Sequence, residues 1–564
     1  MIVKANNIAI ARYASVALIF CAAVIYGGVA TGSTYVVYIP LDSPIYDELD
    51  TLNSLGYLDT YLAGIKPIAR VEAARLVLEA DRILENASHR DALASEMLRS
   101  LHLQLDEEIE WLVNNREDNL PTMVHPIQRF EAGYFYSHGS QRYWRTGIDG
   151  IDAQEATPLM PNQDGLPSAS GSNEVARVSG WGGIGGFLTG YGEGVVAGPI
   201  THGVNTGGRE RVLGAGTVVS LGNFALSFGQ EEMWWGGAKF SALSQGDNAQ
   251  PFPALRAQNI HPFLLPWFFR YLGQFRYQLF FGQLDHGRQF SRPWIDGQVF
   301  AFKPLPNFEF GLTHAIMFGG SGNDNYGFTG FLGRATGFST GDPSNGNTNT
   351  RAGIFLKTNF PSLRGVQLYQ EILGEDNLTN EVPGVGRYLP FLSVSFQGGL
   401  YLPRLTSDGL VDLRFEYAIL HPNYSDHSDS LYWTYKDQLM GDALGPNATS
   451  IHLVLGKWFD LRYKADVDAY YTEEAPWYND HTPYPPTFYP YSQSKERSGG
   501  VAFDLLKIPD RFPLFGASAV DGMKARGAVE YAHALNFERG TDSVRFLISL
   551  SLFLDPGLGS WSWK

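Results

Sequence analysis

The most constraining feature of this sequence is that alternating apolar and polar residues fill most of it. After the first ~33 residues, no apolar run is long enough to cross a membrane as a helix. Near the C-terminus, apolar and mostly polar side chains take alternate positions: Val544, Phe546, Ile548, Leu550 and Leu552 in one set, Ser543, Arg545, Ser549 and Ser551 in the other. Backbone polar groups inside a bilayer must be satisfied within the protein, so a chain that spans it without apolar helices forms a closed barrel. The pattern predicts a transmembrane antiparallel β-barrel with its apolar set facing lipid and its polar set facing the lumen.

Residues 1–33 have the make-up of a secretory signal peptide. Lys4 and Arg12 precede an apolar segment from about Ala14 to Val29, and small residues follow it. The single cysteine, Cys21, lies in this segment, so the exported chain should contain no thiol, disulfide or lipid anchor. Without cysteine it lacks the ligands for c-type haem, thiolate zinc sites and iron–sulfur clusters. We expect no cofactor and no metal centre.

The charge balance argues against nucleic acid as a partner. The formal net charge is −16, and it becomes more negative when the leader, which carries two bases and no acid, is removed. Aromatic residues make up 14% of the chain and glycine occurs 63 times. This composition suits the aromatic girdles and turns of a barrel better than a soluble enzyme.

A change in hydrophobic period divides the exported chain into two predicted domains. Residues 34–120 have helical spacing, which predicts helices from Ser43 to Gly56, from Arg70 to Leu84, and from about Ser88 through Leu112. We expect these helices to form a small periplasmic bundle, or a plug against the inner mouth of the barrel. Residues 121–564 have a period of two, and about 9 to 11 residues per tilted strand give roughly 16 to 20 barrel strands.

Long irregular segments interrupt the alternation and are candidates for recognition. They run from Gly147 to Val175, from Gly319 to Thr350 and from Glu473 to Tyr491. The last of these contains Trp477 and Tyr484 among prolines. In barrels of this kind long loops are extracellular and short turns periplasmic, and loops on a rigid scaffold commonly carry binding sites.

The densest candidate binding cluster follows Phe228 and contains Glu231, Trp234, Trp235 and Asp247. Aromatic faces stack on the apolar face of a sugar ring, while acids accept its hydroxyl protons. We therefore predict a polysaccharide-binding set made of Glu231, Trp234, Trp235, Asp247, Trp433, Tyr435, Trp477 and Tyr484. The sequence is equally consistent with aromatic residues that form a girdle or fold inward to pack the lumen.

Several short motifs, taken in order, resemble the capsule assembly protein family called Wzi. They are Phe228-Gly-Gln with Trp234-Trp235-Gly236, Gly246-Asp247, Gly327-Phe328-Thr329-Gly330, Gly374-Glu375-Asp376 and Gly441-Asp442-Ala443. The order of a helical segment followed by a barrel is similar as well. The resemblance implies a barrel of about 18 strands, a periplasmic helical bundle and a noncatalytic outer-membrane lectin. It implies capsular or other extracellular polysaccharide and outer-membrane lipid as partners, with the capsule-export machinery as a further candidate, for a chain that acts as a monomer.

Enzyme and metal motifs are weak, and we expect no catalytic activity. Gly337-Phe-Ser-Thr-Gly341 matches the nucleophile-elbow string, but no helical pattern follows it. Glu231 and Glu232 are neighbours, so on a strand they would face opposite sides and could not flank one glycosidic bond. The remaining candidates lack ligand spacing, and we expect the acids among them to be solvated in loops: His202, His286, His421, His427, Asp324, Asp466 and Asp468.

The main alternative function is a porin-like channel, or a barrel that sheathes a partner such as a multihaem outer-membrane cytochrome. An open lumen lined by charges would favour this alternative. A lumen plugged by helices or by aromatic loops would favour the polysaccharide-binding barrel instead.

Overall fold

The computed structural model describes most of the chain after residue 32. The described residues are 33–87, 91–114, 120–140, 142–143, 155–156, 159, 162, 164–166, 171–197, 210–286, 290–323, 348–375, 380–382, 386–389, 394–421, 424, 431–436, 438–475, 494–514, 517–555 and 561–563. Several predicted features lie outside them: the signal peptide up to residue 32, Trp477, Tyr484, the Gly337–Gly341 string, Asp324, His202 and His427.

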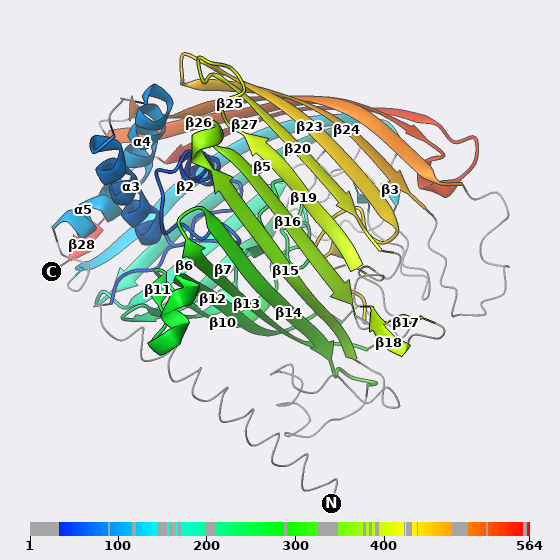
Figure 1. Ribbon diagram of the computed structural model, residues 1–564, viewed down its shortest axis with the longest axis horizontal. Coiled ribbons are helices and arrows are strands. Elements are labelled where there is room, and N and C mark those ends of the chain that lie inside the picture. The colour runs from blue at the N-terminus through cyan, green and yellow to red at the C-terminus, as the bar shows by residue number, and fades with distance from the viewer. Residues whose placement is uncertain are drawn as a thin grey trace, which may run out of the picture.

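A closed antiparallel β-barrel makes up most of the described chain, which confirms the predicted fold class (Figure 1). Within the described residues, 18 strands form the wall and each pairs with the next along the chain. They are β2 (Thr122–His138), β5 (Gly171–Ile184), β6 (Leu188–Ala197), β7 (Glu210–Leu221), β8 (Phe224–Gln230), β10 (Pro253–Asn259), β12 (Gln274–Gln283), β13 (Trp294–Leu305), β14 (Phe308–Phe318), β15 (Thr348–Phe360), β16 (Val366–Glu375), β19 (Val394–Leu402), β20 (Val411–Ile419), β23 (Ala448–Phe459), β24 (Tyr463–Glu474), β25 (Glu496–Leu514), β26 (Ala517–His533) and β27 (Ser543–Asp555). Strand β27 pairs with β2 and closes the barrel.

Short strands accompany the wall. Strand β11 (Phe263–Leu264) extends the pairing of β12, and β28 (Trp561–Trp563) extends that of β2. The others form two-stranded pairs: β1 (Ile65–Lys66) with β9 (Trp234–Trp235), β3 (Arg142–Tyr143) with β4 (Glu155–Ala156), β17 (Asn380–Val382) with β18 (Gly386–Leu389), and β21 (Thr434–Tyr435) with β22 (Gln438–Leu439). The pairing of β1 with β9 joins the start of the chain to a loop inside the barrel.

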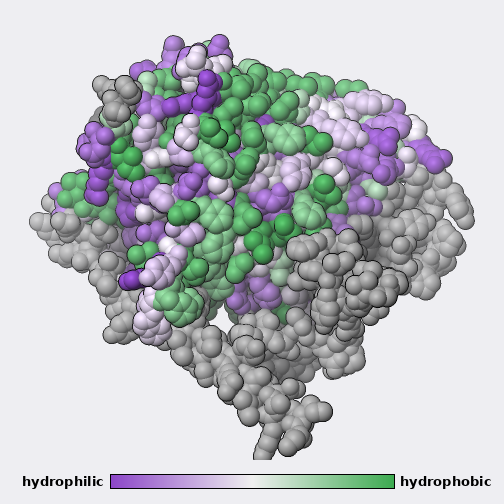
Figure 2. Space-filling model, viewed as in Figure 1, coloured by the Kyte–Doolittle hydropathy of each residue, from purple (hydrophilic) through white to green (hydrophobic). Residues whose placement is uncertain are grey.

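The two faces of the wall have the predicted character. On β27, Val544 and Ile548 are 59% and 60% exposed on the outside, whereas Ser543 and Arg545 are 9% and 5% exposed. Figure 2 shows hydrophobic residues spread across the outer wall and hydrophilic residues gathered toward its ends. None of the helices in the described part of the chain is long and apolar enough to cross a membrane. The predicted alternation is thus confirmed: the apolar side chains face outward and the polar side chains face the lumen.

The two ends of the barrel differ in their connections. At one end the strands are joined by short turns, such as residues 185–187, 222–223, 306–307 and 460–462. This end also carries the helices and is called the helical end (Figure 1). The opposite end has the long connections, including residues 231–252 and 420–447, and is called the loop end.

Among the described residues, four helices precede the wall: α2 (Ile45–Ser54), α3 (Arg70–Glu85), α4 (Ala92–Gln104) and α5 (Asp106–Val113). The first two predicted helices are confirmed. The prediction of one continuous third helix is wrong, because the helix is interrupted at Leu105, where φ is −127° and ψ is 22°. Asp91 begins α4 by accepting a hydrogen bond from the backbone N–H of Ala94 at 3.2 Å. Buried residues of these helices share one apolar core with Trp458 and Ile508 of the wall, so the helices dock on the barrel.

Candidate functional site

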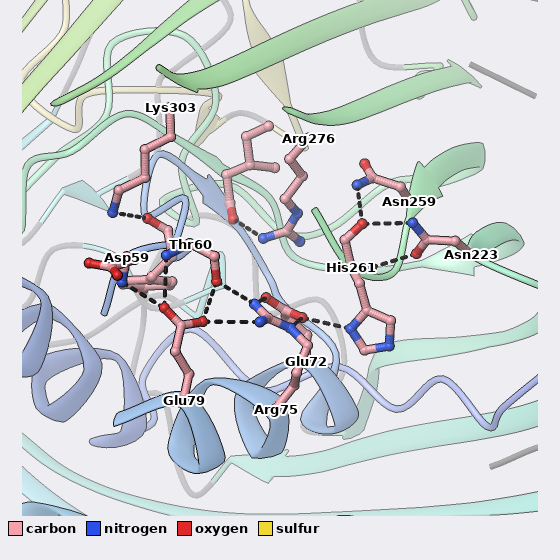
Figure 3. Close-up of polar contacts among 12 residues, drawn as sticks. Asp59, Thr60, Glu72, Arg75, Glu79, Asn223, Asn259, His261, Arg276 and Lys303 are labelled. Atoms are coloured by element: carbon pink, nitrogen blue, oxygen red, sulfur yellow. Dashed lines mark hydrogen bonds and ion pairs between the residues drawn. The ribbon is translucent and has the colours of Figure 1, made fainter. Parts of the chain in front are cut away.

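Residues 33–69, called here the plug segment, enter the lumen and are held there by buried cations of the wall. Arg276 on β12 donates to the carbonyls of Ile65 and Pro67, both at 2.9 Å. Lys303 on β13 donates to the carbonyl of Tyr61 at 2.8 Å (Figure 3). A buried charge is strongly unfavourable unless it is paired and hydrogen-bonded. The plug segment therefore supplies the acceptors that these wall residues require.

Further acidic and basic side chains of the wall also hold the plug segment. The carboxylate of Glu309 on β14 accepts the backbone N–H groups of Ala63 and Gly64, both at 2.9 Å. Lys357 on β15 forms a 2.9 Å ion pair with Asp50 of α2. Both Glu309 and Lys357 are 2% exposed, so these contacts are inaccessible to solvent. Helix α2 is consequently part of the filling of the barrel mouth.

Helix α3 ties the plug segment to the wall on the helical side (Figure 3). Glu79 accepts a hydrogen bond from the backbone N–H of Thr60 at 3.0 Å. Glu72 contacts Arg75 at 2.7 Å and Nδ1 of His261 at 2.6 Å. Burial alone would raise the pKa of Glu72, but Arg75 and His261 hold that pKa at about 2. Helix, plug segment and wall are thus joined through one charged network.

Two connections at the loop end fold back into the lumen, and we call them inner loop 1 (231–252) and inner loop 2 (420–447, described except at 422–423, 425–430 and 437). In inner loop 1, Trp235 Nε1 donates to Gln278 Oε1 on β12 at 2.7 Å. In inner loop 2, Trp433 Nε1 donates to Asn349 Oδ1 on β15 at 2.8 Å. Trp235 and Trp433 belong to one buried apolar cluster that also contains Ile65 of the plug segment. The lumen is therefore packed by three segments from distant parts of the chain.

A single wall side chain, Arg351 on β15, holds both inner loops. Its Nη1 donates to the carbonyl of Ser244 in inner loop 1 at 3.2 Å and to that of Met440 in inner loop 2 at 3.1 Å. Its Nε is 2.7 Å from Glu375 on β16, and its guanidinium lies 4.3 Å from the ring centroid of Trp433. Arg351 is 0% exposed, so all these interactions operate in a dehydrated interior.

Three of the predicted sugar-binding aromatics lie inside this packing. Trp235 and Trp433 are 0% exposed and Tyr435 is 5% exposed. Tyr435 packs edge-on against Phe252, and burial raises its pKa to about 12. In this arrangement none of the three presents a free face to a sugar ring, and their contacts are those of an inward-folded aromatic plug. Their role in polysaccharide binding stays a prediction.

The adjacent acids Glu231 and Glu232 serve different parts of the lumen. Glu231 pairs with Arg256 on β10 and accepts a 2.6 Å hydrogen bond from the hydroxyl of Tyr191. Glu232 accepts the backbone N–H of Leu41 in the plug segment at 2.7 Å. Burial, together with nearby acids, raises the pKa of Glu232 well above its usual range. The two carboxyl groups are therefore committed to separate structural contacts.

Trp234 and Asp247 are the two predicted residues that line a cavity of about 430 Å³. This lumenal cavity lies among the plug segment, inner loop 1, described residues of the connection between β2 and β5, and the wall strands β2, β5, β20 and β23 to β27. Burial and the negative charge of Asp164 raise the pKa of Asp247 to about 8. The volume falls within the roughly 300 to 1,000 Å³ range of small-molecule sites. Of the predicted residues that the structure describes, only these two line this space.

An aromatic stack forms one side of the lumenal cavity. The ring of Phe240 in inner loop 1 stacks on His452 of β23, with centroids 4.2 Å apart and planes at 11°. His452 in turn stacks on Tyr470 of β24 at 5.6 Å and contacts Asp468 at 3.1 Å. Phe240 could not be recognised from the sequence, because a lone phenylalanine in a Gly-rich loop carries no periodic or motif signal.

The acids Asp466 and Asp468 are not solvated loop residues, and that expectation is wrong. Both lie on β24 and face the lumenal cavity, and Asp468 is 1% exposed. Asp466 shares Lys464 with Asp412, each oxygen lying 3.0 Å from Nζ. Across the described residues, no group of three or more His, Cys, Asp or Glu side chains is arranged to hold a metal ion.

Comparisons with known proteins agree with this architecture. The sequence model of the capsule assembly protein Wzi family matches residues 141–499, which is more than half of the chain. A Klebsiella pneumoniae protein described as an uncharacterized 55.8 kDa protein in a cps region is 29% identical over 202 residues, or 35% of this chain and 38% of that relative. The solved structure of Escherichia coli Wzi, described as an outer-membrane protein involved in group 1 capsule assembly and a carbohydrate-binding β-barrel, has a TM-score of 0.61 at 17% identity. It covers 94% of this chain and 100% of its own. The chain belongs to the capsule assembly protein Wzi family.

Proposed function

We propose that this outer-membrane barrel binds extracellular or capsular polysaccharide without catalysis and takes part in its assembly at the cell surface. The filled lumen is the observation that carries this proposal. A channel needs a continuous water-filled path, whereas here the plug segment and both inner loops occupy the interior through buried hydrogen bonds and ion pairs. The family membership and the carbohydrate binding described for Escherichia coli Wzi support the same proposal.

The orientation follows from the lengths of the connections. Long loops are extracellular and short turns periplasmic in barrels of this class, so the loop end faces outward and the helices lie in the periplasm. Polysaccharide would meet the loop end. The predicted residues Trp477 and Tyr484 follow β24 in the sequence and are outside the described residues. The absence of catalysis is supported by Glu231 and Glu232, whose carboxyl groups face different partners rather than one shared bond.

The test measures conductance and polysaccharide binding on the same purified full-length protein. In planar bilayers the folded barrel should be silent, and in detergent it should bind immobilised surface polysaccharide from the producing cell. The variant Trp477→Ala with Tyr484→Ala should weaken binding by about 1 to 3 kcal/mol per stacked ring. The control Trp267→Ala removes a 68% exposed aromatic at the helical end and should bind normally. Steady wild-type channels without polysaccharide binding would refute the proposal in favour of a porin.

A further inference from the structure

The lumenal cavity combines an aromatic platform with an unusual distribution of charge. Phe240 lines the cavity and is only partly buried, although one of its faces is covered by His452 at 4.2 Å. The platform is fixed in place, because Glu416 on β20 accepts the backbone N–H groups of Lys239 and Phe240 at 2.9 and 3.1 Å. An apolar ring therefore borders a space whose other walls are mostly polar.

Many of the charged side chains that line this cavity are paired with one another. The pairs are Asp47 with Lys239 at 2.9 Å, Asp164 with Arg177 at 3.0 Å, Asp504 with Arg526 at 2.7 Å, and Lys464 with both Asp412 and Asp466 at 3.0 Å. An ionic ligand that bound at one of these pairs would have to displace one of its members, which is strongly unfavourable where the pair is buried. A neutral ligand rich in hydroxyl groups can instead bridge the pairs, since each hydroxyl both donates and accepts.

We infer that the lumenal cavity is a binding subsite for a neutral sugar unit, stacked on Phe240 and hydrogen-bonded to the surrounding ion pairs. Aromatic rings prefer the apolar C–H face of a pyranose, and paired acids and bases supply acceptors and donors around its rim. The inference rests on the proposed function and deepens it, because it names the chemical class of the ligand and a place for it inside the barrel rather than on its surface loops.

The test uses the full-length protein in detergent micelles and follows binding by isothermal titration calorimetry. The probes are the neutral disaccharides maltose, cellobiose and lactose, with the acidic disaccharide cellobiouronic acid as the charged comparison. At least one neutral probe should bind, and the acidic probe should bind more weakly. Phe240→Leu removes the ring but keeps an apolar side chain, and it should raise Kd about two- to tenfold.

The matched control is Phe252→Leu, which removes a buried ring of inner loop 1 that does not line the cavity. This variant should bind the neutral probe as the wild type does, while heat-modifiable gel mobility reports that both barrels are folded. Equal loss of affinity in both variants, or stronger binding of the acidic probe, would overturn the inference. Wild-type protein that retains polysaccharide but binds no disaccharide would overturn it and leave the proposed function standing. Wild-type protein that binds neither would reject the proposed function itself.

Discussion

Replacing Arg351 by methionine should release both inner loops without unfolding the barrel. Arg351 contacts the carbonyls of Ser244 and Met440, one in each loop, and also stacks on Trp433. Methionine keeps an apolar side chain of similar length but donates no hydrogen bond and carries no charge. The wall strands retain their backbone pairing, so the effect should appear as local opening of the loops.

The size of the effect follows from the burial of the ion pair. Removing one partner of a buried pair costs about 3 to 5 kcal/mol, and Arg351 and Glu375 are 0% and 9% exposed. Each 1.4 kcal/mol is a factor of ten in an equilibrium constant, so the open population of the loops should rise by about two to three and a half orders of magnitude. The loss of two hydrogen bonds to carbonyls and of the stacking on Trp433 acts in the same direction.

Hydrogen–deuterium exchange on the folded protein measures this opening directly. Peptides from 231–252 and 438–447 should lose protection in Arg351→Met, and single-channel recordings should show conductance that the wild type lacks. Arg545→Met is the matched control, because it breaks a buried pair with Glu530 that joins two wall strands. Unchanged loop protection in Arg351→Met, or equal loop opening in Arg545→Met, would refute the idea that Arg351 clamps the plug.

Two further predictions concern the plug segment. Burial raises the pKa of Glu48 on α2 from 4.5 to about 8, so the docked helix keeps a proton that the undocked one releases. Docking of α2 should be strongest below pH 4.5, weaken by up to about 1.4 kcal/mol per unit as the pH rises toward 8, and level off above it. Glu48→Gln should flatten the pH dependence of α2 docking, measured by hydrogen–deuterium exchange of α2. An unchanged pH dependence in this variant would contradict the assignment of the effect to Glu48. At Gly64 an added Cβ would lie 2.2 Å from a ring atom of Phe355, so Gly64→Ala should lower the free energy of unfolding by roughly 1 to 3 kcal/mol. The control Gly190→Ala meets nothing within 4 Å and should leave stability unchanged, and equal melting of both variants would exclude the clash.

The barrel wall could be predicted because its signal is local. A strand between lipid and lumen must alternate along its own length, so Val544 and Arg545 reveal their faces without reference to any other strand. A turn inside continuous alternation leaves a weaker signal: the alternating stretch from Arg211 to Phe228 contains parts of two strands, β7 and β8, separated by residues 222–223. Gly222, with φ of 59°, allows that turn.

The filling of the lumen could not be predicted because its signal is not local. In the sequence, Trp235 and Trp433 are equally consistent with sugar binding and with packing of the lumen. Their hydrogen bonds to Gln278 and Asn349 on distant wall strands place them inside. Buried cations such as Arg276 face the same difficulty, because an inward polar residue in a barrel is expected whether the lumen is open or filled. The sequence therefore shows that aromatic residues cluster here but not which wall residues surround them.

The path of the plug segment has a consequence for how the molecule is assembled. The seam between β2 and β27 joins the beginning of the wall to its end, so it forms only when the last long strand is present. The plug segment, which fills part of the interior, precedes the whole wall in the chain, and its Ile65 pairs with Trp235 inside the closed cylinder. An empty cylinder would leave Lys303 and Arg276 facing a lumen without their plug acceptors. The last strand therefore closes the wall around residues that come before every wall strand in the chain, and these residues supply acceptors for two of the buried wall cations.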